Sequence, residues 1–367
     1  MSEAGASLVT FRNRHELSLK LKLVILAILV TAVCLSYLFV GLNWKFFDYA
    51  MSIRVPKLCA MIIAALAIGA ASLIFQTLIN NYIVTPCLLG MNSLYLVLHT
   101  VLVFSFGMGS FIVTNKNIAF VCDLALMGSV AGFVYNYLFV KTKYNILYVL
   151  LIGTVLTTFF TSIQSSLVRA MDPNDYDALL VTLVASFSNV NKEVLLLATA
   201  LIIILTMLFY NKLKVLNVIA LGRNNAMSLG IDYEQSLKIL LLFVTLLIAI
   251  ATALVGPVSF IGLITTNVAR QLFKTYKHKY LISGTVLVTL LVLIAGQVII
   301  ERVFIYSIPV SVFITIGGGV YFMYLVLRST KKSYLAKSKC LRSLRHQNLK
   351  TTIKGSFLTY LSMLLIV

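Results

Sequence analysis

Apolar runs close to the length needed to cross a bilayer recur along this 367-residue chain. About twenty helical residues span the roughly 30 Å hydrocarbon core of a membrane. Such runs predict about ten transmembrane helices, at residues 21–41, 56–76, 88–108, 117–140, 145–167, 193–212, 236–255, 258–273, 280–300 and 310–328. With 60% hydrophobic and 11% charged residues, the chain carries more apolar surface than a water-soluble core can bury. The predicted fold class is therefore an all-α integral membrane protein.

Two of these spans are expected to be irregular. Thr85-Pro86 and Gly90 interrupt helical continuity at the start of the third span, and Gly256-Pro257 directly precedes the eighth. The first apolar run, residues 23–40, is longer than the roughly 7–15-residue apolar region of a cleaved signal peptide. We therefore expect it to remain as the first span.

The connections between the spans differ in charge. Those after even-numbered spans hold clusters of Lys and Arg, in "KTKYN" (141–145), "NKLKV" (211–215), "RQLFKTYKHK" (270–279) and "RSTKKSYLAKSKCLR" (328–342). Those after odd-numbered spans hold the acidic residues Asp48, Asp172, Asp175, Asp177 and Glu301. Because basic connections stay in the cytoplasm, both termini and the even connections are predicted to be cytoplasmic. This placement accounts for the net charge of +19 without nucleic acid as a partner.

The sequence contains no residue pattern typical of an enzyme or a metal site. His15, His99, His278 and His346 are far apart, and no nucleophile elbow, HExxH motif or Walker-type phosphate loop occurs. The five cysteines are scattered, without a CxxC pair. We therefore predict no catalytic residue, no cofactor and no bound metal.

Asp123 is the only carboxylate predicted deep inside a span, about two turns from its outer end. One interpretation is a titrating site, as in a transporter coupled to protons. The other is a residue near the outer interface that forms hydrogen bonds to neighbouring helices. The scarcity of other charges in the spans favours the second interpretation.

Four stretches, taken together, resemble one family of bacterial permeases. "RVPKLCAMIIAALAIGAASLIFQTLINN" (54–81) and "TPCLLGMNSLY" (85–95) are similar to its second span and to the opening of its third. "LGRNNAMSLGID" (221–232) is similar to its cytosolic Leu-Gly-x-x-x-Ala-x-x-Leu-Gly loop, and "GPVSFIGLITTNVARQLF" (256–273) to its Gly-Pro-x-x-Phe-Ile-Gly-Leu segment. The chain thus resembles the FecCD-type permeases for iron–siderophore complexes and cobalamin. The second of these stretches looks closer to permeases for catechol-type ferric siderophores.

The resemblance implies the permease fold of a type II ATP-binding-cassette (ABC) importer, in the cytoplasmic membrane of a bacterium. It implies as partners a dimer of cytoplasmic ATPases, an extracytoplasmic siderophore-binding protein and a second permease subunit, identical or homologous. It divides the chain into a cytoplasmic segment (1–20), a permease domain (21–328) and a basic cytoplasmic extension (329–367), to which no role is assigned.

The resemblance also implies sites at both membrane faces. The expected docking cations for the binding protein are Arg54, Lys57 and Arg302. The expected contact with the ATPase is a two-turn helix in 221–232, with Asn224 as its cap and Gly230 as its left-handed stop; its residues are Gly222, Arg223, Ala226, Leu229 and Gly230. The alternatives are interfacial snorkelling cations and a solvated connection.

Hydroxyl and amide side chains mark a candidate substrate pathway in the fifth and eighth spans, although such residues also make ordinary contacts between helices. The pathway candidates are Thr157, Thr161, Gln164, Ser259, Thr265 and Asn267. Thr266 and Asn267 stand where the family usually has Pro-His, which puts a kink or gate at that position in doubt.

The leading functional hypothesis is a non-catalytic permease subunit that moves an iron–siderophore complex, powered by ATP hydrolysis in separate chains. The alternatives are a permease for cobalamin or haem in the same family, a proton-coupled secondary transporter that uses Asp123, and a membrane receptor or structural protein.

Overall fold

The computed structural model describes residues 2–42, 44–142, 146–187, 190–304, 309–325 and 327, and the predicted extension 329–367 lies outside them. The chain divides into one unit of residues 1–319 and a second from Val320 onward, and the first is described below. Its elements are α1 (Ser2–Phe39), η1 (Trp44–Phe46), α2 (Phe47–Ile79), η2 (Pro86–Leu89), α3 (Met91–Phe106), α4 (Phe111–Thr114), α5 (Lys116–Lys141), α6 (Ile146–Ala170), α7 (Pro173–Leu183), α8 (Lys192–Leu213), α9 (Leu216–Ile219), α10 (Arg223–Ser228), α11 (Tyr233–Val255), α12 (Ile261–Phe273) and α13 (His278–Arg302).

Seven helices of the described residues are long and apolar enough to cross a membrane, namely α1, α2, α5, α6, α8, α11 and α13. Two shorter apolar helices, Met91–Phe106 and Val310–Leu325, coincide with the predicted third and tenth spans. The fold is thus all-helical with multiple candidate spans. At the N-terminus α1 continues without a break from the predicted cytoplasmic segment into the first span.

The backbone explains why two of the predicted spans are short helices. Before α3 the chain forms the 3₁₀ turn η2, and Gly90 takes a φ of 89° where that turn meets α3. Before α12 Gly256 has a φ of 91°, and Phe260, a non-glycine residue, has a φ of 62° at the helix start. Left-handed backbone conformations cannot continue an α-helix. The irregularity predicted at both places is confirmed.

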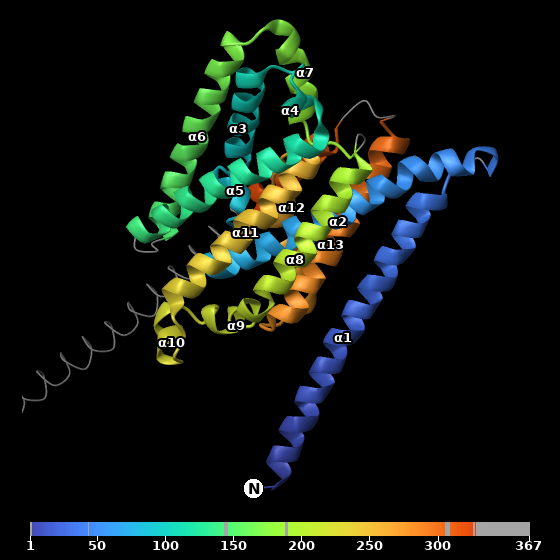
Figure 1. Ribbon diagram of the computed structural model, residues 1–367. Coiled ribbons are helices and arrows are strands. Elements are labelled where there is room, and N and C mark those ends of the chain that lie inside the picture. The colour runs from blue at the N-terminus through green and yellow to red at the C-terminus, as the bar shows by residue number, and fades with distance from the viewer. Residues whose placement is uncertain are drawn as a thin grey trace, which may run out of the picture. The chain divides into compact units, whose positions relative to one another are not determined.

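Helix α2 is the central element of the first unit. It packs against α11 and α13, and more lightly against α12 and α8; α2, α11 and α13 lie side by side in Figure 1. In its most apolar window 78% of the α2 residues are buried, compared with 11% in α1. Small residues recur in the middle of α2 (60–72), which lets neighbouring backbones approach it. Helix α2 is packed on several sides, whereas α1 packs mainly against α13.

Glycines mark the closest approaches between helices. A Cβ added at Gly69 of α2 would lie 2.8 Å from Thr289 Oγ1 of α13. A Cβ at Gly262 of α12 would collide with Ser72 of α2, and one at Gly284 of α13 with the Phe273 ring of α12. Helices α2, α12 and α13 therefore contact one another pairwise through positions that have no room for a side chain.

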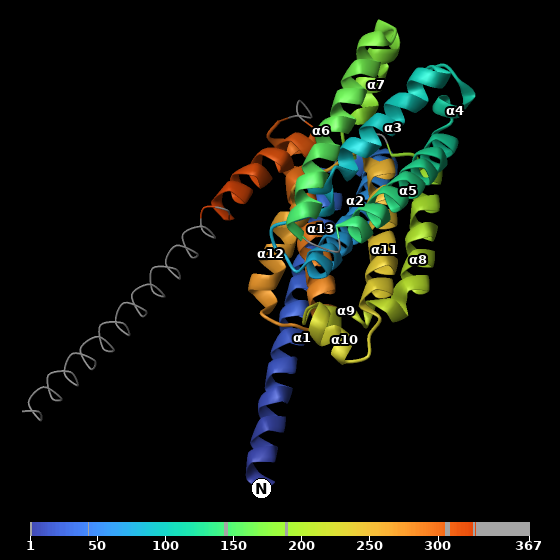
Figure 2. The same cartoon turned by 90° about the vertical axis from the view of Figure 1, so that its left-hand side faces the viewer.

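The connecting helices lie at opposite ends of the bundle. Helix α7 lies at one end and α9–α10 at the other, in both views (Figures 1 and 2). The N-terminal part of α1 projects from the same end as α10 (Figure 2). There α1 is tied to the α12–α13 connection, because Lys22 Nζ donates to Leu272 O at 3.1 Å and Lys277 pairs with Glu16. The hydrogen bond to Glu16 raises the pKa of Lys277 above its ordinary value.

The close contact between α2 and α12 makes Gly262→Ala a direct test of the packing. The new Cβ would lie 2.6 Å from Ser72 Cβ, so one helix must shift. Overpacking of this kind costs about 1–3 kcal/mol, and we expect a lower midpoint of thermal unfolding in detergent. Gly109→Ala is the control, since a Cβ there meets nothing within 4 Å. Equal midpoints for the two variants would contradict the packing described.

Candidate functional site

The segment 221–232 forms a short helix at one end of the bundle. Helix α10 spans Arg223–Ser228, and Gly222 precedes it with a φ of 91°. Gly230 follows with a φ of 78°, so the predicted left-handed stop is confirmed. Neither glycine is near another atom that a Cβ would meet. Their role is therefore to let the backbone turn, and not to make room for a neighbour.

The predicted cap at Asn224 is wrong. The helix begins two residues earlier than a cap at Asn224 requires, because Gly222 occupies the N-cap position and contributes no side-chain hydrogen bond. Asn224 lies inside the helix, where its carbonyl accepts from Ser228 Oγ at 3.0 Å. At the far end Asp232 caps α11 by accepting from the Gln235 backbone N–H at 3.0 Å.

The apolar residues in and beside α10 divide into a buried and an exposed set; Ala226 and Met227 lie in the helix, and Leu221 and Leu229 flank it. Ala226 is fully buried against the rest of the bundle. Leu221, Met227 and Leu229 are 55%, 45% and 62% exposed, respectively. Arg223 pairs with Glu234 of α11 at 2.8 Å, and both side chains are half-exposed. The segment thus presents an exposed apolar surface between two polar features, the Arg223–Glu234 ion pair and the Asp232 cap of α11.

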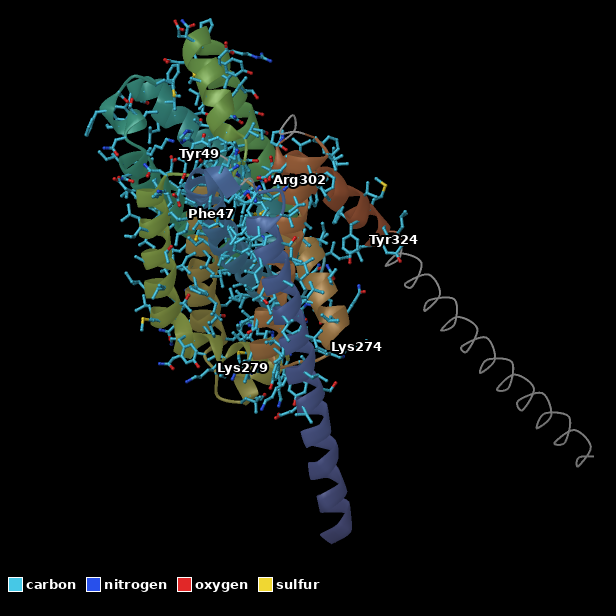
Figure 3. All side chains as sticks on the ribbon, turned by 90° about the vertical axis from the view of Figure 1, so that its right-hand side faces the viewer. Phe47, Tyr49, Lys274, Lys279, Arg302 and Tyr324 are labelled. Atoms are coloured by element: carbon cyan, nitrogen blue, oxygen red, sulfur yellow. The ribbon has the colours of Figure 1, made fainter. Side chains whose placement is uncertain are left out.

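Arg54 and Arg302 lie at the opposite end of the bundle and hold the end of α1. Arg54 Nη1 donates to the carbonyl oxygens of Leu38 at 2.6 Å and Val40 at 3.1 Å. Arg302 also donates to Val40 O. Figure 3 shows Arg302, with Phe47 and Tyr49, at the end away from Lys274 and Lys279. Helix α1 has no continuation to use its last carbonyls, and the two guanidinium groups provide the missing donors.

The third predicted docking cation, Lys57, is 6% exposed. Its Nζ lies 3.6 Å from Glu301 Oε1. The same oxygen accepts from Tyr37 Oη at 3.1 Å and from Gln297 Nε2 at 2.7 Å. A carboxylate from another protein would have to compete with Glu301 for Lys57. Lys57 is therefore a buried, paired cation, whereas the sequence suggested a cation at the surface.

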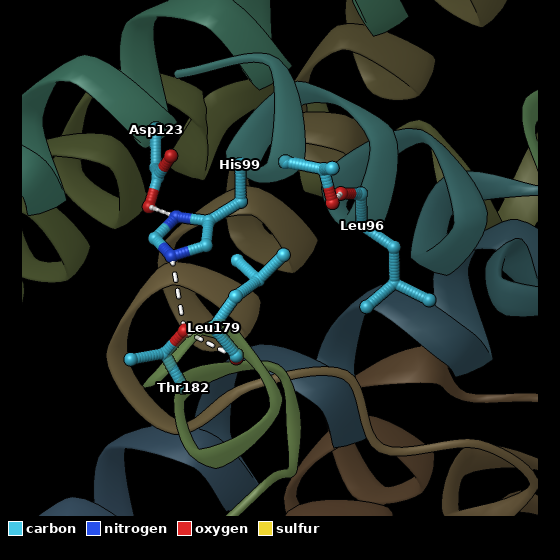
Figure 4. Close-up of polar contacts among 6 residues, drawn as sticks. Leu96, His99, Asp123, Leu179 and Thr182 are labelled. Atoms are coloured by element: carbon cyan, nitrogen blue, oxygen red, sulfur yellow. Dashed lines mark hydrogen bonds and ion pairs between the residues drawn. The ribbon is translucent and has the colours of Figure 1, made fainter. Parts of the chain in front are cut away.

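Asp123 on α5 is buried and pairs with His99 on α3 (Figure 4). Its Oδ2 lies 2.8 Å from His99 Nδ1. His99 Nε2 lies 3.3 Å from the hydroxyl of Thr182 on α7, whose proton is directed to Leu179 O at 2.7 Å. Both ring nitrogens of His99 therefore face an acceptor oxygen. The three side chains tie α3, α5 and α7 together, beside a cavity of about 430 Å³.

The pathway candidates of the fifth predicted span lie along α6. Thr157 and Thr161 are half-buried, and their hydroxyls donate to backbone carbonyls of α6 itself, at 2.8 Å to Gly153 O and 2.9 Å to Thr157 O. Thr157 also lies against Gly90, where a Cβ would be 2.8 Å from its hydroxyl oxygen. Gln164, one turn beyond Thr161, is half-buried too.

The candidates of the eighth predicted span have different surroundings. Ser259 is half-buried and accepts from Asn92 Nδ2 of α3 at 3.0 Å. Thr265 is fully buried, and its hydroxyl accepts from Thr289 of α13 at 2.9 Å, so it lies inside a helix contact. Asn267, in the middle of α12, donates to Tyr82 O at 3.1 Å. The structure therefore brings Thr157 and Ser259 to the junction of η2 and α3, and does not bring all six candidates together.

Sequence reasoning missed the partners of the charged residues. His99 and Asp123 are 24 residues apart and on different helices, so no local spacing links them. Gln297 and Glu301 are four residues apart on α13, a spacing that places side chains on one helix face and that could have been noticed. The contact of Asn217 with His278 joins α9 to the start of α13, and no pattern in the sequence indicates it.

The helical bundle with its several candidate spans defines a membrane protein of the multi-pass class. The chain belongs to the FecCD transport family, which it matches over residues 21–328. It is therefore a multi-pass permease subunit of a bacterial ABC importer, and a non-catalytic chain. Family membership removes the proton-coupled, receptor and structural alternatives.

Two curated relatives and one solved structure are similar to the chain. The petrobactin import system permease protein YclO of Bacillus subtilis is 38% identical over 322 residues, which cover 87% of this chain and 99% of YclO. The corresponding protein FatC of Bacillus anthracis is 31% identical, over 75% of this chain and 78% of FatC. A putative metal-chelate type ABC transporter in an inward-facing conformation has a TM-score of 0.71 at 19% identity, over 84% of this chain and 99% of that one. That likeness supports the fold.

The Asp123–His99 pair can be tested as a structural contact with single and double variants. Removal of one partner leaves a buried polar group without its ion pair, whereas replacement of both by apolar residues is often close to neutral. We expect Asp123→Leu and His99→Leu each to lower the thermal unfolding midpoint, and the double variant to lose less than the sum. Strictly additive losses would show that the two side chains do not interact.

Proposed function

We propose that this subunit carries a ferric siderophore of the catecholate type across the cytoplasmic membrane, as one of two permease chains in the importer. Support for the substrate comes from relatives whose names state petrobactin import, at 38% and 31% identity over most of the chain. A permease for cobalamin or haem is the alternative within the family. A hemin transport permease of Yersinia pestis is 24% identical over 77% of this chain, which gives that alternative weaker support.

We further propose ten membrane passages with both chain ends in the cytoplasm. Seven described helices have spanning length, and α3, α12 and Val310–Leu325 are the shorter ones that would complete the count. The excess of Lys and Arg in even-numbered connections supports the orientation. The projection of the α1 start at the same end as α10 agrees with it (Figure 2).

The observation that carries the proposed coupling role is the exposed apolar surface of the segment 221–232, at the predicted cytoplasmic end; Met227 of α10 and the flanking Leu221 and Leu229 form it. Leu221, Met227 and Leu229 are exposed, although this end is expected to face water. An apolar helix face of this kind fits into a groove of a partner protein. We assign that partner as the ATPase, with Gly222 and Gly230 shaping the segment and Ala226 anchoring it. Nucleotide binding that closes the ATPases would then move this segment and switch the permease between outward and inward access.

Docking of the extracytoplasmic binding protein is proposed for the other end, through Arg54 and Arg302. Ion pairs at the rim of an interface guide association and fix its register more than they add affinity. Lys57 would act there through Glu301, since their ion pair keeps both side chains largely buried. The pathway role of Thr157, Thr161, Gln164, Ser259 and Asn267 remains part of this proposal, and the buried Thr265 is the least suited of the six.

Leu229→Asp tests the coupling assignment. Leu229 is 62% exposed, so a charge there leaves the permease fold intact but opposes burial against an apolar groove. We expect the ATPase to be lost from the purified complex, with normal membrane insertion of the permease. Asn224→Asp adds the same charge to an exposed position of the same helix and should retain the ATPase. Recovery of equal ATPase with both variants would refute the assignment.

Ala226→Arg is a less specific probe than Leu229→Asp. Because Ala226 is fully buried, an arginine would displace α10 itself as well as any partner. Loss of the ATPase with this variant would therefore not separate a docking defect from a folding defect.

A further inference from the structure

A cavity of about 710 Å³ lies at the end of the bundle that carries α10. It is formed where the end of α2, α9, α12 and the start of α13 meet. Its volume is in the range of small-ligand sites, roughly 300–1,000 Å³. Its walls include Tyr82, Asn217, Arg270, Lys274 and His278. The polar and aromatic character of these walls makes the cavity a candidate ligand site.

The cavity carries positive charge without an acidic counterpart. Among the described residues that line it, Arg270 and Lys274 are cationic and none is an aspartate or glutamate. The guanidinium of Arg270 lies 4.5 Å from the centre of the Tyr82 ring, and its Nη2 donates to Thr77 Oγ1 at 3.4 Å. Its Nε is buried and has no hydrogen-bond partner in the described part of the chain. A buried N–H group of a charged side chain needs an acceptor.

Three polar side chains of the wall, those of Thr77, Asn217 and His278, are engaged with one another. His278 Nδ1 lies 2.9 Å from Asn217 Oδ1, and its Nε2 lies 3.0 Å from Thr77 Oγ1. The backbone N–H of His278 donates to the same Asn217 oxygen at 3.0 Å. These contacts fix α9 to the start of α13 and to α2. Arg270 and Lys274, both from the C-terminal end of α12, are thus the cations that an incoming anion would meet.

The position of the cavity indicates the kind of anion. It lies at the proposed cytoplasmic ends of the spans, where anionic lipid headgroups attract basic residues. The α12–α13 connection there carries the exposed Tyr276 and Lys274, and the first turn of α13 carries the exposed Lys279. Lys274 and Lys279 are labelled in Figure 3. Tyrosine and lysine side chains are typical of the membrane–water interface. A phosphate group in this layer matches the charge of the cavity and can accept hydrogen bonds from the guanidinium of Arg270, which lines it.

We propose that this cavity binds a phosphate oxyanion, supplied by the headgroup of an anionic phospholipid of the inner leaflet. The proposal rests on the orientation given under the proposed function. Inorganic phosphate in the cytosol has the same chemistry and is the other possible source. Because Asn217 and Leu221 line the same cavity directly before α10, a bound headgroup would hold the ATPase-coupling segment against α12. Transport would then depend on anionic lipid.

The test measures lipid retained by the complete importer after purification from membranes that contain phosphatidylglycerol and phosphatidylcholine. Native mass spectrometry counts the bound lipids. Because charge-assisted hydrogen bonds contribute about 1.5–3 kcal/mol, Arg270→Gln should lower retained phosphatidylglycerol about tenfold or more. Lys274→Gln should lower it less, and Arg270→Lys should keep part of it. Lys279→Gln, which removes an exposed charge in the first turn of α13 outside the cavity lining, is the control and should retain the wild-type amount.

A phosphate titration distinguishes a lipid headgroup from inorganic phosphate as the source of the oxyanion, and ATPase recovery shows whether the complex still assembles. Inorganic phosphate is titrated into the complex in phosphatidylcholine nanodiscs, with thermal stability as the readout. An Arg270-dependent stabilisation by phosphate without phosphatidylglycerol retention would overturn the lipid source and keep the oxyanion site. Equal retention in Arg270→Gln, Lys274→Gln and Lys279→Gln, without an effect of phosphate, would overturn the site itself. The amount of ATPase recovered with Arg270→Gln should be normal. If the lipid site is refuted, the coupling assignment is therefore unaffected, because Leu229→Asp tests it separately.

Discussion

The close packing of α2 against its neighbours is the constraint on which the rest of the structure depends. Small residues between Ala60 and Ser72 allow α12 and α13 to approach α2 to distances at which a side chain at Gly69 or Gly262 has no room. In a membrane the attraction between apolar helices comes from packing and not from expulsion of water. The positions of the two functional ends are fixed relative to each other because both are attached to these central helices.

Several charged residues of the bundle form hydrogen bonds or ion pairs between helices. Arg54 and Arg302 complete the end of α1, Lys57 is paired with Glu301, and Asp123 is paired with His99. Buried charges are costly unless they are paired and hydrogen-bonded, which explains why the buried Lys57 and Asp123 each have a partner from another helix. The apolar side chains in and beside α10 are exposed where buried ones would be expected, and we propose that a partner protein covers them.

Much of the fold could be predicted from the sequence because the bilayer imposes a length on every span. Each predicted span coincides with a helix, and the breaks at Gly90 and Gly256 were visible as glycine and proline. Local geometry was less accessible. Asn224 resembled a helix cap by residue type, but Gly222, with a positive φ, is the N-cap and the helix starts two residues earlier. The burial of Lys57 and the pairing of His99 with Asp123 depend on which helices are neighbours, and this information is not local in the chain.

ATP-driven iron uptake by the reconstituted importer tests whether an ATPase bound at α10 drives this permease. The measurement follows radiolabelled iron, delivered as a ferric catecholate siderophore with the binding protein, into proteoliposomes that hold both permease chains and the ATPases. The account predicts accumulation with ATP and none when a hydrolysis-deficient ATPase replaces the active one. Accumulation driven by a proton gradient in the absence of ATP would contradict it.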